Sequence, residues 1–441
     1  MNAGNQSGLV RVIGRWTLVA LVINGIIGSG IFGLPDDVAR LVGRAAPLAY
    51  LIAALGIGII MACFAETASR FTEAGGPYLY TRKAFGSLAG IQIGWFAWLV
   101  RLTSAAANAN LFVVYLGEFF SGATRPIPRA ATLTVLIGLL AIVNIRGVKS
   151  GASVSNAFTV AKLLPLGVFI VAGLALVGGR ISIGGAAASA GNWLQAVLVL
   201  IFAYGGFEAA LMPMGEAKEP RRDAPFALFM ALIVVTVVYM LAHLVVMAAI
   251  TDPLAFNQPE VREKPLAEAA RVFLGGGGAG LIALGVLVST YGYLAGQFVS
   301  APRLTFAFAE QRDFPKYFAA VHNQFRTPYV SILVYTALVW GLAIYGSFIW
   351  NAILSAVARL FTYGLVCAAL LRLRRVQPEA AFFRLPAGWL ASFLGMAFCV
   401  LMVTQMGSEH LKIVLVIAAV ALLNWLWMRS KIGGHTKSGS T

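Results

Sequence analysis

Charged residues are scarce in this sequence. Asp, Glu, Lys and Arg make up 11% of its 441 residues, and there are four histidines and three cysteines. So little charge excludes a soluble globular domain, which needs a polar surface. The cysteines (Cys63, Cys367 and Cys399) all lie in apolar runs, which indicates no disulfide framework. Neither an HExxH nor a GxSxG motif is present, so we expect no enzyme activity, no cofactor and no metal site.

Long apolar segments dominate the chain instead. Hydrophobic residues account for 59% of it, and the mean hydropathy is +0.83. A helix of roughly 20 apolar residues crosses a bilayer. Segments of about this length occur at 15–41, 46–71, 89–120, 130–146, 153–178, 192–215, 224–250, 278–309, 328–347, 351–371, 387–406 and 410–429. The sequence therefore predicts an all-α membrane protein with about twelve transmembrane helices, between short tails at 1–14 and 430–441 and with no large soluble domain.

The net charge of +16 is distributed unevenly along the chain. Alternate connections between the apolar segments hold 21 of the 33 Lys and Arg residues, and the other connections hold 9. Basic residues concentrate on the cytoplasmic side of membrane proteins. This pattern predicts a multi-pass protein of the cell (inner) membrane with both termini in the cytoplasm, and it makes nucleic acid an improbable partner.

The first apolar segment contains the run VINGIIGSGIFGLP at 22–35. Gly25, Gly28, Gly30 and Gly33 crowd into two helical turns, where each glycine costs roughly 1 kcal/mol relative to alanine. One interpretation is a helix unwound at Gly28–Gly30, because non-helical backbone inside a membrane survives where it lines a cavity. The alternative is a close helix–helix contact through small residues.

A second interruption favours the unwound helix. Gly205 and Gly206 lie in the middle of the sixth segment, and the ionisable Glu208 follows. The first and sixth segments are equivalent if the chain contains two halves of five spans, at 15–178 and 191–375, with two peripheral helices at 384–429. Five is odd, so the second half must be inverted. Inverted repeats with paired broken helices indicate a transport site near the bilayer midplane; we expect unwound backbone at 28–30 and 204–206.

Between the second and third spans, residues 73–86 are too polar to cross the membrane. The spacing of Tyr78, Tyr80 and Phe85 favours a short amphipathic helix at the cytoplasmic interface. A plain linker is the alternative interpretation.

Five motifs occur in order at the expected spans. They are GIIGSGIFGLP (25–35), EAGGPYLYTRKAFG (73–86), AKLLPL (161–166), FAYGGFE (202–208) and EAKEPRRDAP (216–225). Over about residues 11–430 the chain resembles the amino acid–polyamine–organocation (APC) superfamily, and in particular the bacterial amino acid permeases and the light-subunit amino acid exchangers. The resemblance implies a LeuT-like fold: ten helices in a 5+5 inverted repeat, with helices 1 and 6 broken, plus two peripheral helices.

The resemblance also implies a substrate site at the two breaks. Free N–H groups at a break can bind a carboxylate, and free carbonyls can bind an ammonium. Ser29 and Gly30 are implied at the substrate carboxylate, and Phe202 is implied to close the pocket from outside. The implied binding site consists of Ile26, Gly28, Ser29, Gly30, Phe202, Ala203 and Gly205, with the carbonyls of Ile26, Phe202 and Gly205 at the ammonium. Asn108 either faces this pocket or makes a helix–helix hydrogen bond.

Charges inside spans are functional hypotheses because they are expensive to bury. Lys162 matches the position where a basic residue of the family replaces a sodium ion, and it would bridge the first helix to the eighth near Ser289 and Thr290; the alternative is a lysine that reaches to the cytoplasmic face. Glu208 is either a proton-sensing or gating group or a structural cap.

Two arginines inside spans fit no family pattern. Arg101 and Arg359 have no role that the resemblance carries over, and each is expected to pair with an acid, with Glu66 and Glu216 as candidates for Arg101.

The sequence thus predicts a sodium-independent secondary transporter of neutral L-amino acids of small to medium size, working by alternating access as a proton symporter or an exchanger. The alternatives are a transporter or antiporter of cationic amino acids or polyamines, and a non-transporting amino acid sensor. Protons and the lipid bilayer are the expected partners besides the substrate, and no obligatory protein partner is evident.

Overall fold

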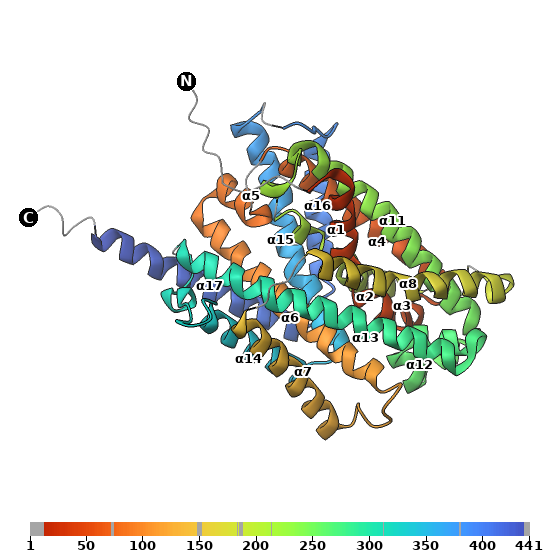
Figure 1. Cartoon of the computed structure of the whole chain (residues 1–441). Helices are drawn as coiled ribbons and strands as arrows, with labels where there is room; N and C mark the ends of the chain where they lie inside the picture. Colours follow the sequence, from red (N-terminus) through yellow and green to blue (C-terminus); the bar gives the residue numbers. More distant parts are fainter. Residues whose placement is uncertain are drawn as a thin grey trace, which may run out of the picture.

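The computed structural model describes the backbone of residues 13–71, 75–147, 152–182, 184, 188–212, 214–311, 313–378 and 381–435. Helix accounts for 83% of the part of the chain that the structure describes. Long helices run across the molecule at different inclinations, as Figure 1 shows. This architecture confirms the all-α fold that the hydropathy predicts.

The first half of the chain contains α1 (Arg15–Ile26), α2 (Gly30–Gly33), α3 (Pro35–Val42), α4 (Ala46–Ala68), α5 (Gly76–Phe85), α6 (Ser87–Leu116), α7 (Pro126–Arg146) and α8 (Ala152–Val177). The second half contains α9 (Ala190–Tyr204), α10 (Phe207–Ala210), α11 (Pro220–Ala249), α12 (Pro259–Glu263), α13 (Pro265–Glu310), α14 (Tyr329–Tyr345) and α15 (Phe348–Val376). The chain ends with α16 (Gly388–Val403) and α17 (Ser408–His435).

Ten helical stretches of the described chain are long and apolar enough to cross a membrane, and α14 and α16 are shorter apolar helices. Together they give the twelve spans expected. Several boundaries differ from the prediction by a few residues, and the fourth and eighth spans are two examples. The fourth span, predicted at 130–146, begins at Pro126 because proline is compatible with the first helical turn. The eighth, predicted at 278–309, follows Gly275, whose non-helical conformation (φ 67°, ψ −164°) separates it from a short helical stretch of α13 that begins at Pro265.

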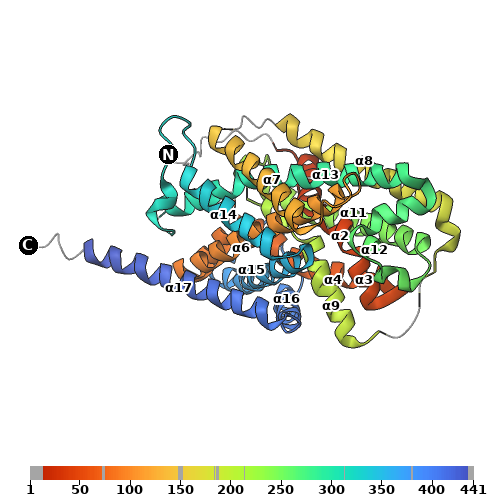
Figure 2. The same ribbon diagram turned by 90° about the horizontal axis from the view of Figure 1, so that it is seen from below.

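The helices of the two halves form one bundle around α6. Helix α6 packs against α13 and α15, while α1 packs on α11 and α8 on α13. Helices α16 and α17 lie outside, α16 on α15 and α4, and α17 on α6. In Figure 2 the C-terminal end of α17 lies at the left and α3 and α12 lie at the right. The amphipathic helix expected at 73–86 is α5 (Gly76–Phe85).

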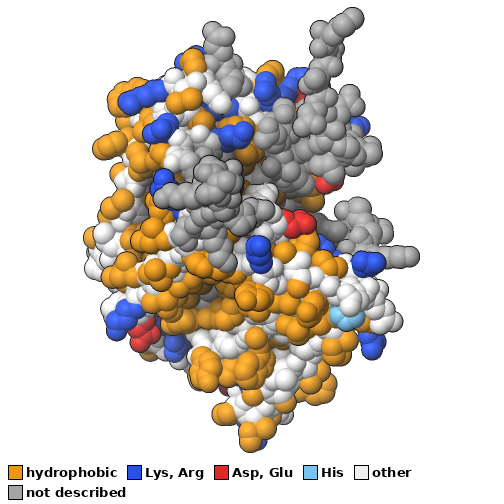
Figure 3. Space-filling view, turned by 90° about the vertical axis from the view of Figure 1, so that its left-hand side faces the viewer, with side chains coloured by type: hydrophobic (Ala, Val, Ile, Leu, Met, Phe, Trp, Pro, Cys, Tyr) orange, Lys and Arg blue, Asp and Glu red, His pale blue; other side chains and the backbone are white. Residues whose placement is uncertain are grey.

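Apolar side chains cover broad areas of the face in Figure 3, and Lys and Arg are prominent among its charged groups. Buried ion pairs hold the helix ends together. Glu66, which is fully buried, accepts hydrogen bonds from Arg70 (2.8 Å) and Arg374. Glu118, just beyond α6, pairs with Lys264 (2.5 Å) and with Arg271, which connects α6 to the start of α13. Burial opposes ionisation of Glu118, but these two cations prevail and hold its pKa below the usual value.

Candidate functional site

The first transmembrane helix is interrupted as the glycine pattern predicts. Helix α1 ends at Ile26 and α2 begins at Gly30, so residues 27–29 are not helical. Ile27 has an extended conformation (φ −69°, ψ 98°). Among the described residues, the backbone N–H groups of Gly28 and Ser29 find no acceptor, and neither does the Ser29 hydroxyl, which is buried. The break begins one residue before the predicted stretch, and it leaves hydrogen-bond donors free.

The sixth helix is interrupted at Gly205–Gly206, between the end of α9 at Tyr204 and the start of α10 at Phe207. Gly206 has φ 114°, a conformation that side chains disfavour. A Cβ on Gly206 would lie 2.2 Å from the carbonyl oxygen of Gly25. Position 206 therefore requires glycine for two reasons: the backbone angle and the close approach of the first broken helix.

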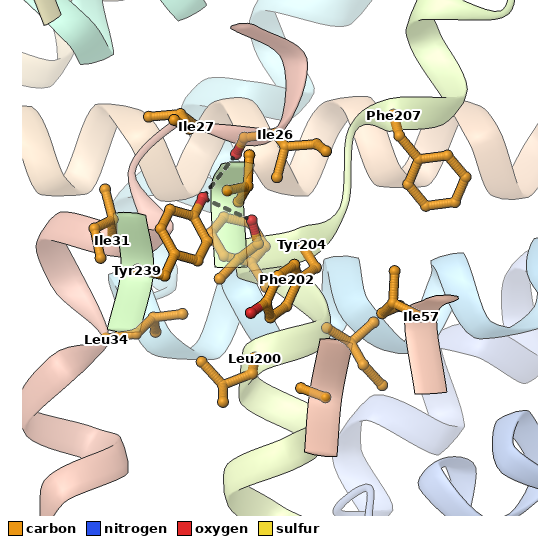
Figure 4. Close-up of a cluster of buried hydrophobic side chains, with 14 of the residues drawn as sticks. Ile26, Ile27, Ile31, Leu34, Ile57, Leu200, Phe202, Tyr204, Phe207 and Tyr239 are labelled. Carbon is orange, nitrogen blue, oxygen red and sulfur yellow. Dashed lines mark hydrogen bonds between the residues drawn. The ribbon is translucent and has the colours of Figure 1, made fainter. Parts of the chain in front are cut away.

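The two broken helices touch along their backbones. A Cβ on Gly30 would lie 2.7 Å from Cα of Ala203, in addition to the contact of Gly206 with Gly25. The glycines therefore serve both interpretations of the sequence, because they permit an unwound segment and a close helix–helix contact. The hydroxyl of Tyr239 in α11 connects the same elements, at 3.2 Å from the Ile26 carbonyl oxygen and 3.0 Å from that of Ala203 (Figure 4).

A small pocket lies between the breaks, with only about 20 Å³ of free space. It is lined by Gly25, Ile26, Gly28, Ser29, Gly30, Ser104, Asn108, Phe202, Gly205, Tyr293 and Arg359. Three polar atoms of these residues are buried without a partner in the described chain: Ser29 Oγ, Asn108 Oδ1 and Arg359 Nη1. Buried polar atoms are normally hydrogen-bonded, so three such atoms in one pocket indicate a polar ligand.

Asn108 lies at the pocket, which is one of its two expected positions, and no helix–helix hydrogen bond of its side chain is found among the described residues. It lines the pocket, and its amide donates to the carbonyl oxygen of Ser104 in its own helix (2.8 Å). Phe202, at the end of α9, contacts Phe348 edge-to-face with ring centroids 6.0 Å apart. The Phe202 ring also makes a cation–π contact with the Arg359 guanidinium, which lies 5.8 Å from the ring centroid. Phe202 thus separates the pocket from α15's first turn.

Glu208 lies at the start of α10, and its carboxylate accepts three hydrogen bonds. Its carboxylate accepts hydrogen bonds from the Gly206 backbone N–H (2.9 Å), the Tyr363 hydroxyl (2.9 Å) and Nε of Arg359 (3.0 Å). Arg359 thus pairs with an acid, as expected, but the partner was not predictable because the two residues are 151 positions apart. The first of these bonds is the cap that one interpretation of Glu208 predicts.

Arg101 does not have the partner expected from the sequence. Glu66 and Glu216 were the candidates, and the prediction of Glu66 is wrong because that carboxylate pairs with other arginines. The Arg101 guanidinium instead contacts uncharged groups: Gln297 Oε1 (3.2 Å), Ser300 Oγ (3.3 Å) and Met212 Sδ (3.1 Å). None of the salt bridges found among the described residues involves Arg101. The partners of Arg101 depend on how α6 packs against α13, and the hydropathy of the sequence does not predict this packing.

Lys162 points at the end of the first half-helix. Its ammonium donates to the carbonyl oxygens of Asn24 (2.8 Å) and Ile27 (2.7 Å), and the side chain is buried. The expected bridge to the eighth helix is not made by hydrogen bonds of Ser289 or Thr290. The Ser289 hydroxyl has no partner among the described residues, and the Thr290 hydroxyl bonds to Val286 in its own helix.

A larger cavity of about 790 Å³ adjoins the breaks. Its wall contains four ionisable groups discussed above, Lys162, Glu208, Arg101 and Arg359. It continues to Tyr78 in α5 and Phe308 near the end of α13, so it extends toward the end of the molecule where α5 lies.

A bundle with two broken helices that meet at a polar pocket defines the class of secondary transporters. Residues 13–425 match the amino acid permease family, and the chain belongs to this family. It is similar to the serine/threonine exchanger SteT of Bacillus subtilis, with 30% identity over 76% of each chain. It is also similar to the methylthioribose transporter (26% identity, 96% of this chain and 95% of that one) and the branched-chain amino acid permease BcaP (25%, 91% and 89%) of the same organism.

Proposed function

We propose that the protein is a sodium-independent secondary transporter that moves an α-amino acid across the cell membrane by alternating access. The observation that carries this proposal is the meeting of the two breaks, where unpaired backbone N–H groups and backbone carbonyls lie at a pocket with three polar atoms that have no partner among the described residues. Backbone N–H donors and carbonyl acceptors at one point suit a zwitterionic α-amino acid, whose carboxylate and ammonium are both attached to the α-carbon.

In this proposal the substrate carboxylate accepts hydrogen bonds from the N–H groups of Gly28, Ser29 and Gly30. Its ammonium donates to the carbonyls of Ile26, Phe202 and Gly205. The Tyr239 hydroxyl lies 3.0 Å from the Ala203 carbonyl oxygen and 3.2 Å from that of Ile26, so it positions the backbone of both breaks, and the Ile26 carbonyl keeps a second lone pair for the substrate. Because the backbone recognises what all α-amino acids share, side chains around the pocket are left to select the substrate.

Lys162 replaces a coupling sodium ion in the proposed cycle. Its ammonium contacts the last carbonyls of α1, where a cation is favoured by the helix dipole and by unsatisfied acceptors. Either proton symport or exchange is compatible with this role. The name of the similar serine/threonine exchanger of Bacillus subtilis supports exchange.

The distribution of Lys and Arg supports an orientation with both termini in the cytoplasm. In that orientation the 790 Å³ cavity opens inward, because α5 and the end of α13 lie at the cytoplasmic end. We propose that this is the inward-facing conformation and that the repeats, 15–178 and 191–375, rock about the breaks to give the outward-facing one, with 384–429 as a peripheral pair of helices.

The substrate side chain is less constrained than the backbone contacts. The sequence predicts a neutral side chain of small to medium size. The cationic alternative would need a free acid, and Glu208 already accepts three hydrogen bonds, one of them from Arg359. These contacts weigh against arginine and polyamines as substrates. An acidic side chain is the remaining class.

Uptake into proteoliposomes tests the proposal. The purified protein is reconstituted into vesicles loaded with an unlabelled amino acid mixture, and uptake of radiolabelled neutral, acidic and cationic amino acids is measured with sodium and with choline. We expect uptake of at least one α-amino acid at equal rates in both media. A folded, monodisperse preparation that transports nothing from this panel, or that binds amino acids without moving them, would contradict transport and support a sensor.

A further inference from the structure

The ionisable side chains around the pocket and the cavity do not balance. Three cations, Lys162, Arg101 and Arg359, and one acid, Glu208, line these two adjoining spaces. Arg359 and Glu208 neutralise each other at 3.0 Å. Lys162 is held by two carbonyls at the negative end of α1. Arg101 forms no ion pair with a described side chain: Glu208 attracts it only at longer range and is already paired with Arg359.

Arg101 is held in a way that suits a bound anion. Arg101 is 9% exposed, and the hydrogen-bond partners of its guanidinium are an amide, a hydroxyl and a thioether. A buried guanidinium without a carboxylate is unfavourable, and a sulfur atom is a weak acceptor. A carboxylate can accept two parallel hydrogen bonds from a guanidinium, which makes it the natural missing partner. The cavity wall leaves room for such a ligand, because Arg101 is part of it.

Arg359 has one donor without a partner among the described residues. Its Nη1 is buried in the small pocket without a partner, while its Nη2 contacts Ser104 Oγ at 3.4 Å. Ser104 is three residues beyond Arg101 in α6, roughly 5 Å along the helix axis. Arg359 lines both the small pocket and the larger cavity, and Arg101 lines the larger cavity, so both guanidinium groups face the spaces that adjoin the breaks.

Resting on the proposed function, we infer that the preferred substrate is an α-amino acid with an anionic side chain. The breaks hold its α-carboxylate and ammonium, and its side-chain anion accepts hydrogen bonds from Arg359 Nη1 or from Arg101. A neutral amino acid fills the first two sites but leaves the cation excess unchanged. A cationic one adds to it. Arg101 and Arg359 are the residues that determine this specificity.

The test compares acids with their amides, which differ in charge and hardly in shape. Proteoliposomes containing the full chain are preloaded with unlabelled amino acids, and uptake of labelled glutamate and aspartate is measured against glutamine and asparagine. We expect at least one acid to be preferred over its amide tenfold or more in kcat/KM. Cysteate, which carries a sulfonate, shows whether any anionic side chain suffices; transport restricted to carboxylates or extending to cysteate both leave the inference standing.

Arg101→Gln removes the cation that forms no ion pair with a described side chain. We expect the acid-to-amide ratio to fall at least tenfold, with Arg101→Lys retaining an intermediate ratio because it keeps the charge without the planar pair of donors. Arg125→Gln, which changes an exposed arginine outside the cavity, should leave the ratio unchanged. The ratio distinguishes specificity from a structural role, because a structural defect would slow acid and amide alike. If Arg101→Gln does not fold, the wild-type ratio and Arg101→Lys still decide.

Equal transport of acid and amide by the wild-type protein would overturn the inference, and so would a variant ratio that stays at the wild-type value. Transport of neutral amino acids without glutamate or aspartate would also overturn it, while leaving the proposed amino acid transport intact. Absence of any uptake by folded protein would instead refute the proposed function itself.

Discussion

Replacing Lys162 by methionine tests whether the lysine organises the first broken helix. Methionine keeps an unbranched apolar stem of similar length and removes the ammonium. The variant loses the two hydrogen bonds to the carbonyls of Asn24 and Ile27, at 2.8 and 2.7 Å. Both acceptors lie at the end of α1, where the chain leaves the helix and no intrahelical donor replaces the lost ones.

The size of the effect follows from these two bonds. A hydrogen bond to a charged group contributes about 1.5–3 kcal/mol. Two of them contribute about 3–6 kcal/mol to the conformation with the helix broken in this place. Since about 1.4 kcal/mol corresponds to a factor of ten, the population of that conformation should fall by a factor of about 10² to 10⁴. We therefore expect the transport rate of Lys162→Met to be below about 1% of the wild-type rate.

The assay is the initial rate of uptake into proteoliposomes, normalised to the amount of reconstituted protein. Lys162→Arg should restore little, because guanidinium is larger and planar. Lys412→Met, at an exposed position in α17, is the matched control and should transport normally. Residual transport of Lys162→Met separates the mechanisms: loss of pH dependence supports proton symport, whereas an equal reduction at every pH supports exchange. Near-normal transport by Lys162→Met would refute the reasoning and leave a lysine that reaches to the interface.

Three further substitutions probe the breaks and an ion cluster. Gly206→Ala puts a Cβ 2.2 Å from the Gly25 carbonyl oxygen at φ 114°, so we expect at least a tenfold lower uptake rate; a normal rate would mean that the backbones are not in contact during transport. Gly30→Val should abolish thermal stabilisation by substrate while the protein still inserts, and retained stabilisation would move the carboxylate site elsewhere. Glu118→Gln should lower stability by about 1 kcal/mol at neutral pH. Because the folded-state pKa of Glu118 is lowered, that difference from wild type should be complete above pH about 4.3 and vanish as the pH falls through the folded-state value, and a difference that persists in acid would contradict it.

The spans and breaks could be predicted because they depend on local sequence. Apolar length alone determines where helices can cross a bilayer. Gly28 and Gly206 weaken a helix through their own backbone freedom, whatever packs around them. Both interruptions therefore lie within a residue or two of their predicted positions. Where α13 begins was missed because the kink at Gly275 separates its first turns from the apolar run that was recognised.

Contacts between distant helices could not be predicted from one sequence. Glu66 is four residues before Arg70, a spacing at which side chains of a helix meet, and this local signal could have excluded it as the partner of Arg101. The pairing of Arg359 with Glu208 depends instead on how α15 packs beside the second break, and no periodicity encodes that. The same is true of the Tyr239 hydroxyl, which lies between carbonyls of both broken helices.

The contacts of the two intramembrane cations follow the inverted repeat. Helices α8 and α15 are the fifth spans of the two halves, and the broken helices are the first spans. Lys162 on α8 binds the carbonyls at the first break, and Arg359 on α15 binds Glu208 at the second. Each half thus holds its own broken helix with a cation from its last helix, but one cation binds backbone and the other binds a carboxylate. Arg359 Nη1 has no partner among the described residues while Glu208 occupies Nε, so the cation that holds the second break also keeps a donor available to a substrate. The repeats are therefore equivalent in how they hold the breaks and different in what they can select.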